Sequence, residues 1–170
     1  MEQSRNYLRK VLVAVDGSPP SECALKYALF VATSFNAQLV AIYVVEEEKV
    51  GYWRFIDEHL KKELIQKARE VLEEAEELAR EQQVAVHTEI LQGSKPYEEI
   101  VRYLEKDPEI TTVVMGAYGV GLTDRHLLGS TAERVIRLIA KEAIPVAVTV
   151  VPFVEPDSEA CQIYAGPLCS

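Results

Sequence analysis

Apolar residues gather in five short runs along the chain, at residues 8–15, 38–45, 84–91, 110–115 and 144–151. The runs are nearly continuous and rich in β-branched residues, and each one predicts a strand that is buried on both faces. Between the runs, apolar positions recur at helical spacing after Ser18 and over residues 56–83, 97–105 and 129–141. We therefore expect four helices, the first of them capped by Ser18.

The alternation of strands and helices predicts an α/β protein. We expect a single doubly wound, five-stranded parallel sheet of the Rossmann-like kind, with strand order 3-2-1-4-5 and helices on both faces. Residues 1–151 would form this one domain, and residues 152–170 an irregular tail rich in proline, glycine and acidic residues. In such a sheet the ligand site lies at the carboxyl ends of the strands, where the winding reverses between strands one and four.

Charge and composition narrow the functions that this fold could serve. The chain has 170 residues and a formal net charge of -9, from 27 acidic and 18 basic residues. Such a surface repels a phosphate backbone, so we expect no nucleic-acid partner. We find no run with the length of a signal peptide core or of a membrane span, and we expect a cytoplasmic protein with no membrane contact.

The three cysteines, Cys23, Cys161 and Cys169, fit neither a Cys-x-x-Cys redox pair nor a zinc site. Cys23 lies in a helical pattern and is predicted to be a small buried apolar residue. Cys161 and Cys169 fall in the tail, and a reducing cytosol argues against a disulfide between them.

A glycine-rich stretch follows the fourth predicted strand. Gly116 and Gly119 are followed, after nine residues, by Gly129 and the hydroxyl residues Ser130 and Thr131, where the next helix begins. Glycines let the backbone approach a ligand closely, and a helix N-terminus offers unpaired N–H groups and the positive end of its dipole. Phosphate is the natural ligand, and we expect Gly116 and Gly119 at the ribose and first phosphate.

Other interpretations of these residues stay open on the sequence. Ser130 with Glu133 also forms a capping box, Gly119 could serve only a turn, and Asp16 could serve only the turn after the first strand. His126 has no second histidine or cysteine near it and is predicted to be a loop residue. A Walker loop is excluded because no lysine precedes Ser130, and the dinucleotide fingerprint is absent after the first strand.

Together these residues resemble the ATP-binding type of the universal stress protein family. The family's signature, Gly-x-x-Gly, nine residues, Gly-Ser/Thr, runs here from Gly116 to Ser130 without a gap. The resemblance covers roughly residues 10–151 and includes the Asp16-Gly17-Ser18 turn. It departs from the family in the acidic, aromatic insert at 46–54 and in the tail.

The resemblance implies a site for ATP, or for ADP or AMP, with Mg²⁺ or Mn²⁺ held mainly by the phosphates. Asp16 and Gly17 would lie at the adenosine, Ala14 in the adenine wall, and the backbone of Val44 at the adenine edge. The ribose and the first phosphate would contact Met115, Gly116 and Gly119, and the distal phosphates would contact Gly129, Ser130 and Thr131.

The resemblance also implies a nucleotide-dependent stress-response or signalling switch with an unknown protein partner and little or no hydrolysis. A slow ATPase would be the most activity expected, because Arg125 is the loop's one basic side chain besides His126. Residues 145–151 would be an apolar edge strand without a guarding charge, which predicts a homodimer through strand five. The alternatives are an adenylyl-transferring or ATP-hydrolysing enzyme of the wider adenine-nucleotide-binding α/β group, and an interaction module without nucleotide.

Overall fold

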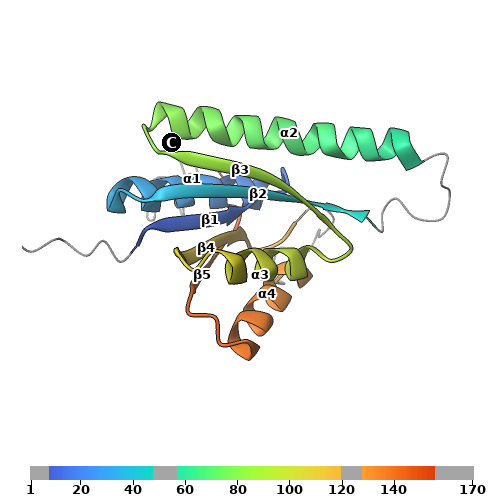
Figure 1. Ribbon diagram of the computed structural model, residues 1–170. Coiled ribbons are helices and arrows are strands. Elements are labelled where there is room, and N and C mark those ends of the chain that lie inside the picture. Colours follow the sequence, from blue (N-terminus) through green and yellow to red (C-terminus); the bar gives the residue numbers. More distant parts are fainter. Residues whose placement is uncertain (1–7, 48–56, 120–127, 156–170) are drawn as a thin grey trace, which may run out of the picture.

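The computed structural model describes residues 8–47, 57–119 and 128–155, in which strands and helices alternate along the chain (Figure 1). The insert beyond Glu47, including Tyr52 and Trp53, lies outside the described residues, as do Arg125, His126, Cys161 and Cys169. In order, the elements are β1 (Lys10–Ala14), α1 (Pro19–Phe35), β2 (Gln38–Glu46), α2 (Asp57–Glu81), β3 (Val86–Gly93), α3 (Pro96–Lys106), β4 (Ile110–Gly116), α4 (Ser130–Lys141) and β5 (Ala147–Val151).

The five strands form one parallel sheet in the order β3-β2-β1-β4-β5, which confirms the predicted topology. At the end of β1, Ala14 aligns with Ile42 of β2 on one side and with Met115 of β4 on the other. The chain therefore changes its direction of winding between β1 and β4. Three strands converge at this point, and the loops after β1 and β4 lie next to each other.

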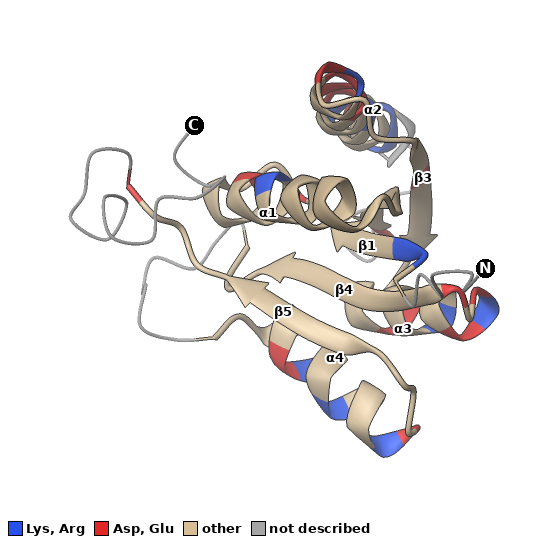
Figure 2. Cartoon of the chain, turned by 90° about the vertical axis from the view of Figure 1, so that its left-hand side faces the viewer, with Lys and Arg blue, Asp and Glu red and all other residues tan. Residues whose placement is uncertain are grey.

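Side chains alternate between the two faces of the sheet, and helices cover both. Val11 and Val13 pack with α1 and α2, whereas Leu12 packs with α3 and α4. Figures 1 and 2 show these two helix pairs on opposite sides of the sheet. All three side chains have no exposed surface, so the central strand is buried on both faces, as its continuous apolar sequence predicted.

Helix α1 begins as the sequence predicted. The Ser18 side chain is the N-cap and accepts a hydrogen bond from the backbone N–H of Ser21 at 3.4 Å. Pro19 and Pro20 occupy the first turn, where a missing N–H costs nothing. Cys23, on the same helix, is a free, buried cysteine, which confirms its predicted packing role.

Three predicted strand starts are early. The first apolar run was expected to begin at residue 8, but β1 begins at Lys10. The other two misses lie after a helix-to-strand turn. The third apolar run was expected to begin at residue 84, but β3 begins at Val86 because Gln83 turns the chain with a positive φ of 58°. The fifth was expected from residue 144, but β5 begins at Ala147, after Ala143 with a φ of 53°. In both cases the apolar residues before the strand belong to the helix-to-strand turn, where hydrophobicity does not distinguish a turn from an extended backbone.

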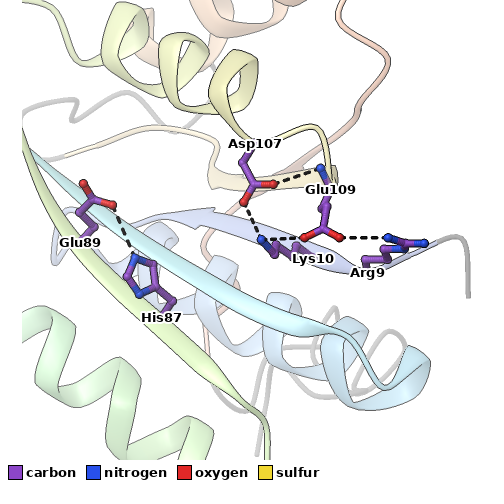
Figure 3. Close-up of polar contacts among 6 residues, drawn as sticks. All are labelled: Arg9, Lys10, His87, Glu89, Asp107 and Glu109. Carbon is purple, nitrogen blue, oxygen red and sulfur yellow. Dashed lines mark hydrogen bonds and ion pairs between the residues drawn. The ribbon is translucent and has the colours of Figure 1, made fainter.

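Four charged residues join β1 to the loop before β4 at the amino-terminal edge of the sheet (Figure 3). Lys10 Nζ lies 2.8 Å from Asp107 Oδ2 and 3.0 Å from Glu109 Oε2, and Arg9 donates to Glu109 Oε1 at 3.0 Å. The ammonium of Lys10 lowers the pKa of both carboxyl groups, and they in turn raise the pKa of Lys10. This network lies at the edge opposite the carboxyl ends of the strands, where it joins the start of β1 to the loop before β4.

Candidate nucleotide site

A cavity of about 550 Å³ lies at the carboxyl ends of β1, β2 and β4 and at the start of α4. This is the expected place for a ligand in a doubly wound sheet. The structure brings nine of the ten predicted site residues into its lining: Ala14, Asp16, Val44, Met115, Gly116, Gly119, Gly129, Ser130 and Thr131.

One side of the cavity is an apolar wall that belongs to the core between the sheet and the α3–α4 pair. Ala14, Ile42, Val44 and Met115 project there from three adjacent strands. Further lining residues missed by sequence reasoning, Pro96, Ile100 and Ala132, come from α3 and α4. Such a wall suits a flat apolar group.

The backbone of Val44 faces the same space. The N–H of Val15 donates to the carbonyl oxygen of Ile42 at 2.9 Å, so the peptide groups of Ile42 point toward β1. Backbone direction alternates along a strand, and the groups of Val44 therefore also point toward the β1 side. The last pair between these strands is Ala14 with Ile42, so β1 offers Val44 no ladder partner. This geometry leaves an N–H and a carbonyl at the cavity's edge.

Asp16 is held in place by the cap of α1. Its Oδ1 accepts hydrogen bonds from the backbone N–H of Ser18 at 2.9 Å and from the Ser18 hydroxyl at 2.5 Å. Its own N–H donates to Ser21 Oγ at 3.2 Å, which adds Ser21, a residue that sequence reasoning missed, to the site. Asp16 thus forms the turn and also lines the cavity, so the two interpretations of this residue are compatible.

The first two glycines of the signature permit close contact within the protein itself. A Cβ on Gly116 would lie 3.0 Å from the backbone nitrogen of Ser21, and one on Gly119 would lie 2.6 Å from Asp16 Oδ2. The first distance is tighter than almost all real Cβ contacts, and the second is shorter than real Cβ atoms show. The glycines therefore let the end of β4 pack directly on the start of α1 and on Asp16, which closes one side of the cavity.

Gly129 begins α4 as its N-cap. Its N–H donates to the carbonyl oxygen of Ala117 at 2.7 Å, which joins the two ends of the glycine-rich loop. The capping-box interpretation of Ser130 is wrong, because Ser130 is the first helical residue and no side chain caps this helix. Glu133 pairs instead with Arg137 at 2.9 Å, so the hydroxyl of Ser130 and the first N–H groups of α4 are not used in a cap.

Gly17 does not line the cavity. It has a positive φ of 75°, and a Cβ there would lie 3.1 Å from Val71 Cγ2 and 3.6 Å from Lys67 Cε of α2. The structure therefore gives Gly17 a packing role beneath α2. Lys67 itself does line the cavity, and sequence reasoning missed it because it looks like an ordinary solvated residue of a charged helix.

Tyrosines and a second carboxylate complete the lining. Tyr43, Glu46 and Tyr118 were not predicted, and none carries a sequence signal beyond its place at a strand end or in the glycine-rich stretch. Burial raises the pKa of Tyr43, and the negative charges of Asp16 and Glu46 raise it further. The phenol is therefore neutral at physiological pH and can donate a hydrogen bond.

None of the described helices has both the length and the apolar character needed to cross a bilayer. The same part of the chain holds no group of three or more His, Cys, Asp or Glu side chains that could bind a metal ion.

Comparison with known proteins agrees with this geometry. A universal stress protein of Methanocaldococcus jannaschii is 38% identical over 143 residues, which are 81% of each chain. The structure of UspA from Lactobacillus plantarum superposes with a TM-score of 0.71 at 27% identity and covers 85% of this chain and 97% of its own. A universal stress protein from Archaeoglobus fulgidus in complex with dAMP has a TM-score of 0.61 at 21% identity, over 84% of this chain and 97% of its own. The model of the Universal stress protein family matches residues 8–152, and the chain belongs to that family.

Proposed function

We propose that the protein binds ATP, or ADP or AMP in its place, in the cavity at the carboxyl ends of β1, β2 and β4. The observation that carries this proposal is the meeting of three features in one cavity of about 550 Å³: an apolar wall, a fixed carboxylate and a helix N-terminus. A nucleotide needs all three, for its base, its ribose and its phosphates. A protein of the same fold holds dAMP, so the fold can accommodate an adenine nucleotide.

In the proposed complex the base lies against Ala14 and Met115, with its polar edge at the backbone of Val44. Adenine offers both a donor and an acceptor on that edge, which match a carbonyl and an N–H. Asp16 accepts hydrogen bonds from the ribose hydroxyls, because a carboxylate held by Ser18 keeps its direction without further loss of entropy.

The phosphates extend toward α4. The N–H groups of the first turn, the helix dipole, and the hydroxyls of Ser130 and Thr131 all favour negative charge there. Ser130 is exposed and Thr131 half-buried, so a ligand can reach both. We propose that Mg²⁺ or Mn²⁺ enters with the nucleotide and is held mainly by its phosphates.

We further propose that the bound nucleotide serves as a stress-response or signalling switch and is hydrolysed slowly or not at all. Fast phosphoryl transfer needs a cation and a positioned base that act more strongly on the transition state than on bound ATP. Gly129, Ser130 and Thr131 supply ground-state contacts. Among the described residues that line the cavity, the charged side chains are Asp16, Glu46 and Lys67, and none of them belongs to α4, where the phosphates would lie.

Single-turnover hydrolysis of labelled ATP by stoichiometric protein tests this proposal. We expect a rate far below the roughly 1 to 10³ per second of typical enzymes. Fast release of phosphate would make the protein an ATPase, and release of pyrophosphate with an adenylylated acceptor would support an adenylyl-transferring enzyme. Limited proteolysis of residues 117–128 with and without nucleotide tests the switch, and equal cleavage in both states would refute it.

We propose that the protein forms a homodimer through β5. We also propose that it acts in the cytoplasm and has a protein partner that distinguishes its nucleotide-bound form from its free form. β5 is at the edge of the sheet, and its five residues, Ala-Val-Thr-Val-Val, carry no charge. Ala147 is exposed and Val148, Thr149 and Val150 are half-buried, as a strand that can pair with a second copy would be.

A further inference from the structure

Helix α2 reaches the cavity over Gly17, at the turn after β1. Because Gly17 has no side chain, Val71 packs on its α-carbon, and the aliphatic part of Lys67 lies alongside, with Cε 3.6 Å from the place of a Cβ. Leu64, one turn earlier in α2, joins Lys67 in the cavity lining. The packing of α2 on a glycine thus places Lys67, which is otherwise exposed, in the cavity lining.

Lys67 makes none of the ion pairs that its own helix offers. Glu63 stands four residues before it and Glu70 three residues after it, the spacings at which helical side chains pair. Glu63 lies instead 3.2 Å from His59, and Glu70 accepts a hydrogen bond from Gln66 at 3.1 Å. Within the part of the chain that the structure describes, no hydrogen bond or ion pair engages Lys67.

The charges around the cavity make this lysine significant. Of the described residues in the lining, Lys67 is the one with a basic side chain, and Asp16 and Glu46 are acidic. The whole chain carries a formal charge of -9. A phosphate-bearing ligand would meet a repulsive potential in the cavity unless a cation offsets the two carboxylates.

We propose that Lys67 is a further ligand-binding residue, outside the glycine signature, that selects for phosphorylated over unphosphorylated adenine compounds. The inference rests on the proposed nucleotide function. The ammonium group is a compact charge on a flexible stem anchored at Gly17, so it can follow the ligand's phosphates without a fixed contact. Its contribution grows with the ligand's negative charge and is absent for adenosine.

The test compares Lys67→Gln with the wild-type protein in calorimetric titrations with adenosine, AMP and ATP in the presence of Mg²⁺. We expect affinity for ATP to fall about 3- to 10-fold, affinity for AMP to fall less and affinity for adenosine to stay the same. The loss for ATP should shrink at high salt, because the cavity rim is open to solvent. Lys67→Arg keeps the charge and should retain most of the affinity.

Lys61→Gln is the matched control, because it removes the same charge from an exposed position of the same helix. It should bind all three ligands as the wild type does, and equal losses in both variants would overturn the inference by showing an effect of net charge alone. Unchanged ATP affinity in Lys67→Gln would also overturn it, as would an equal loss for adenosine. If the wild-type protein binds none of the three ligands, the proposed nucleotide function fails together with this inference. If the wild-type protein binds ATP and Lys67→Gln binds it equally well, only this inference fails.

Discussion

Gly119→Ala is a small substitution with a large expected effect on the site. A Cβ at residue 119 would lie 2.6 Å from Asp16 Oδ2, well inside van der Waals contact. Asp16 cannot simply rotate away, because its other oxygen accepts hydrogen bonds from the N–H and the hydroxyl of Ser18. The methyl group must therefore displace either the carboxylate or the loop that carries residue 119.

The size of the effect follows from the contacts that are lost. A hydrogen bond to a charged group contributes about 1.5–3 kcal/mol, so displacing the carboxylate from its proposed ribose contact should weaken nucleotide binding about 10- to 100-fold. If the bonds to Ser18 are also strained, the free energy of unfolding should fall by about 1 kcal/mol. The expected losses of nucleotide affinity and of stability both depend on the displacement of Asp16.

A double-mutant cycle measures that coupling. Calorimetric titration with ATP and urea unfolding are carried out for Gly119→Ala, Asp16→Ala and the combined variant. We expect Gly119→Ala to cost little when Asp16 is already shortened, because the methyl group then has nothing to displace. Gly93→Ala is the control. Its Cβ would meet the longer side chain of Glu99, neither residue lines the cavity, and ATP affinity should not change. Wild-type affinity in Gly119→Ala, or the same loss with and without Asp16, would refute the reasoning.

Three further predictions concern stability and assembly. Thr111→Val should raise the free energy of unfolding, measured by urea titration, by about 1 kcal/mol. The reason is that the buried Thr111 hydroxyl has no hydrogen-bond partner among the described residues. A lower free energy of unfolding in the variant would contradict this. Ala147→Lys with Thr149→Lys should give a monomer by light scattering, and an unchanged mass would place the interface elsewhere. Lys10→Met should lower the melting temperature by a few degrees at pH 7. Because Lys10 lowers the pKa of Asp107, the stability that this pair contributes is present above the carboxyl's unfolded pKa and is lost as the pH falls through its folded pKa. The difference in melting temperature between Lys10→Met and the wild type should therefore close below about pH 4. A difference that stays constant with pH would contradict this assignment.

The three central strands could be predicted from the sequence because they are buried on both faces, whereas the edge strands β3 and β5 are only partly buried, contrary to the expectation for their apolar runs. A run such as Val11 to Val13 has no polar position at which to meet water, so its place in a covered parallel sheet follows from hydrophobicity alone. Strand starts were less certain, because the turn before β5 is also apolar. The start of β5 depends on a positive φ at Ala143, which no local pattern in the sequence announces.

The cavity's residues could be predicted where the chain itself carries a signal. The spacing from Gly116 to Ser130 identified the stretch between β4 and α4, and its glycines at 116, 119 and 129 and Ser130 line the cavity. Gly17 and Lys67 show the limit of this reasoning. Their roles arise from the packing of α2 on the turn after β1, and this contact joins segments far apart in the chain. Neither residue type nor spacing indicates such a contact.

The nucleotide content of the purified protein tests the central proposal most directly. Native mass spectrometry of the wild-type protein, followed by chromatography of the small molecules released on denaturation, reports what the cavity holds. The proposal predicts one adenine nucleotide per chain, either carried through purification or taken up when ATP and Mg²⁺ are added. A protein that carries no nucleotide and takes up none at millimolar ATP would contradict it.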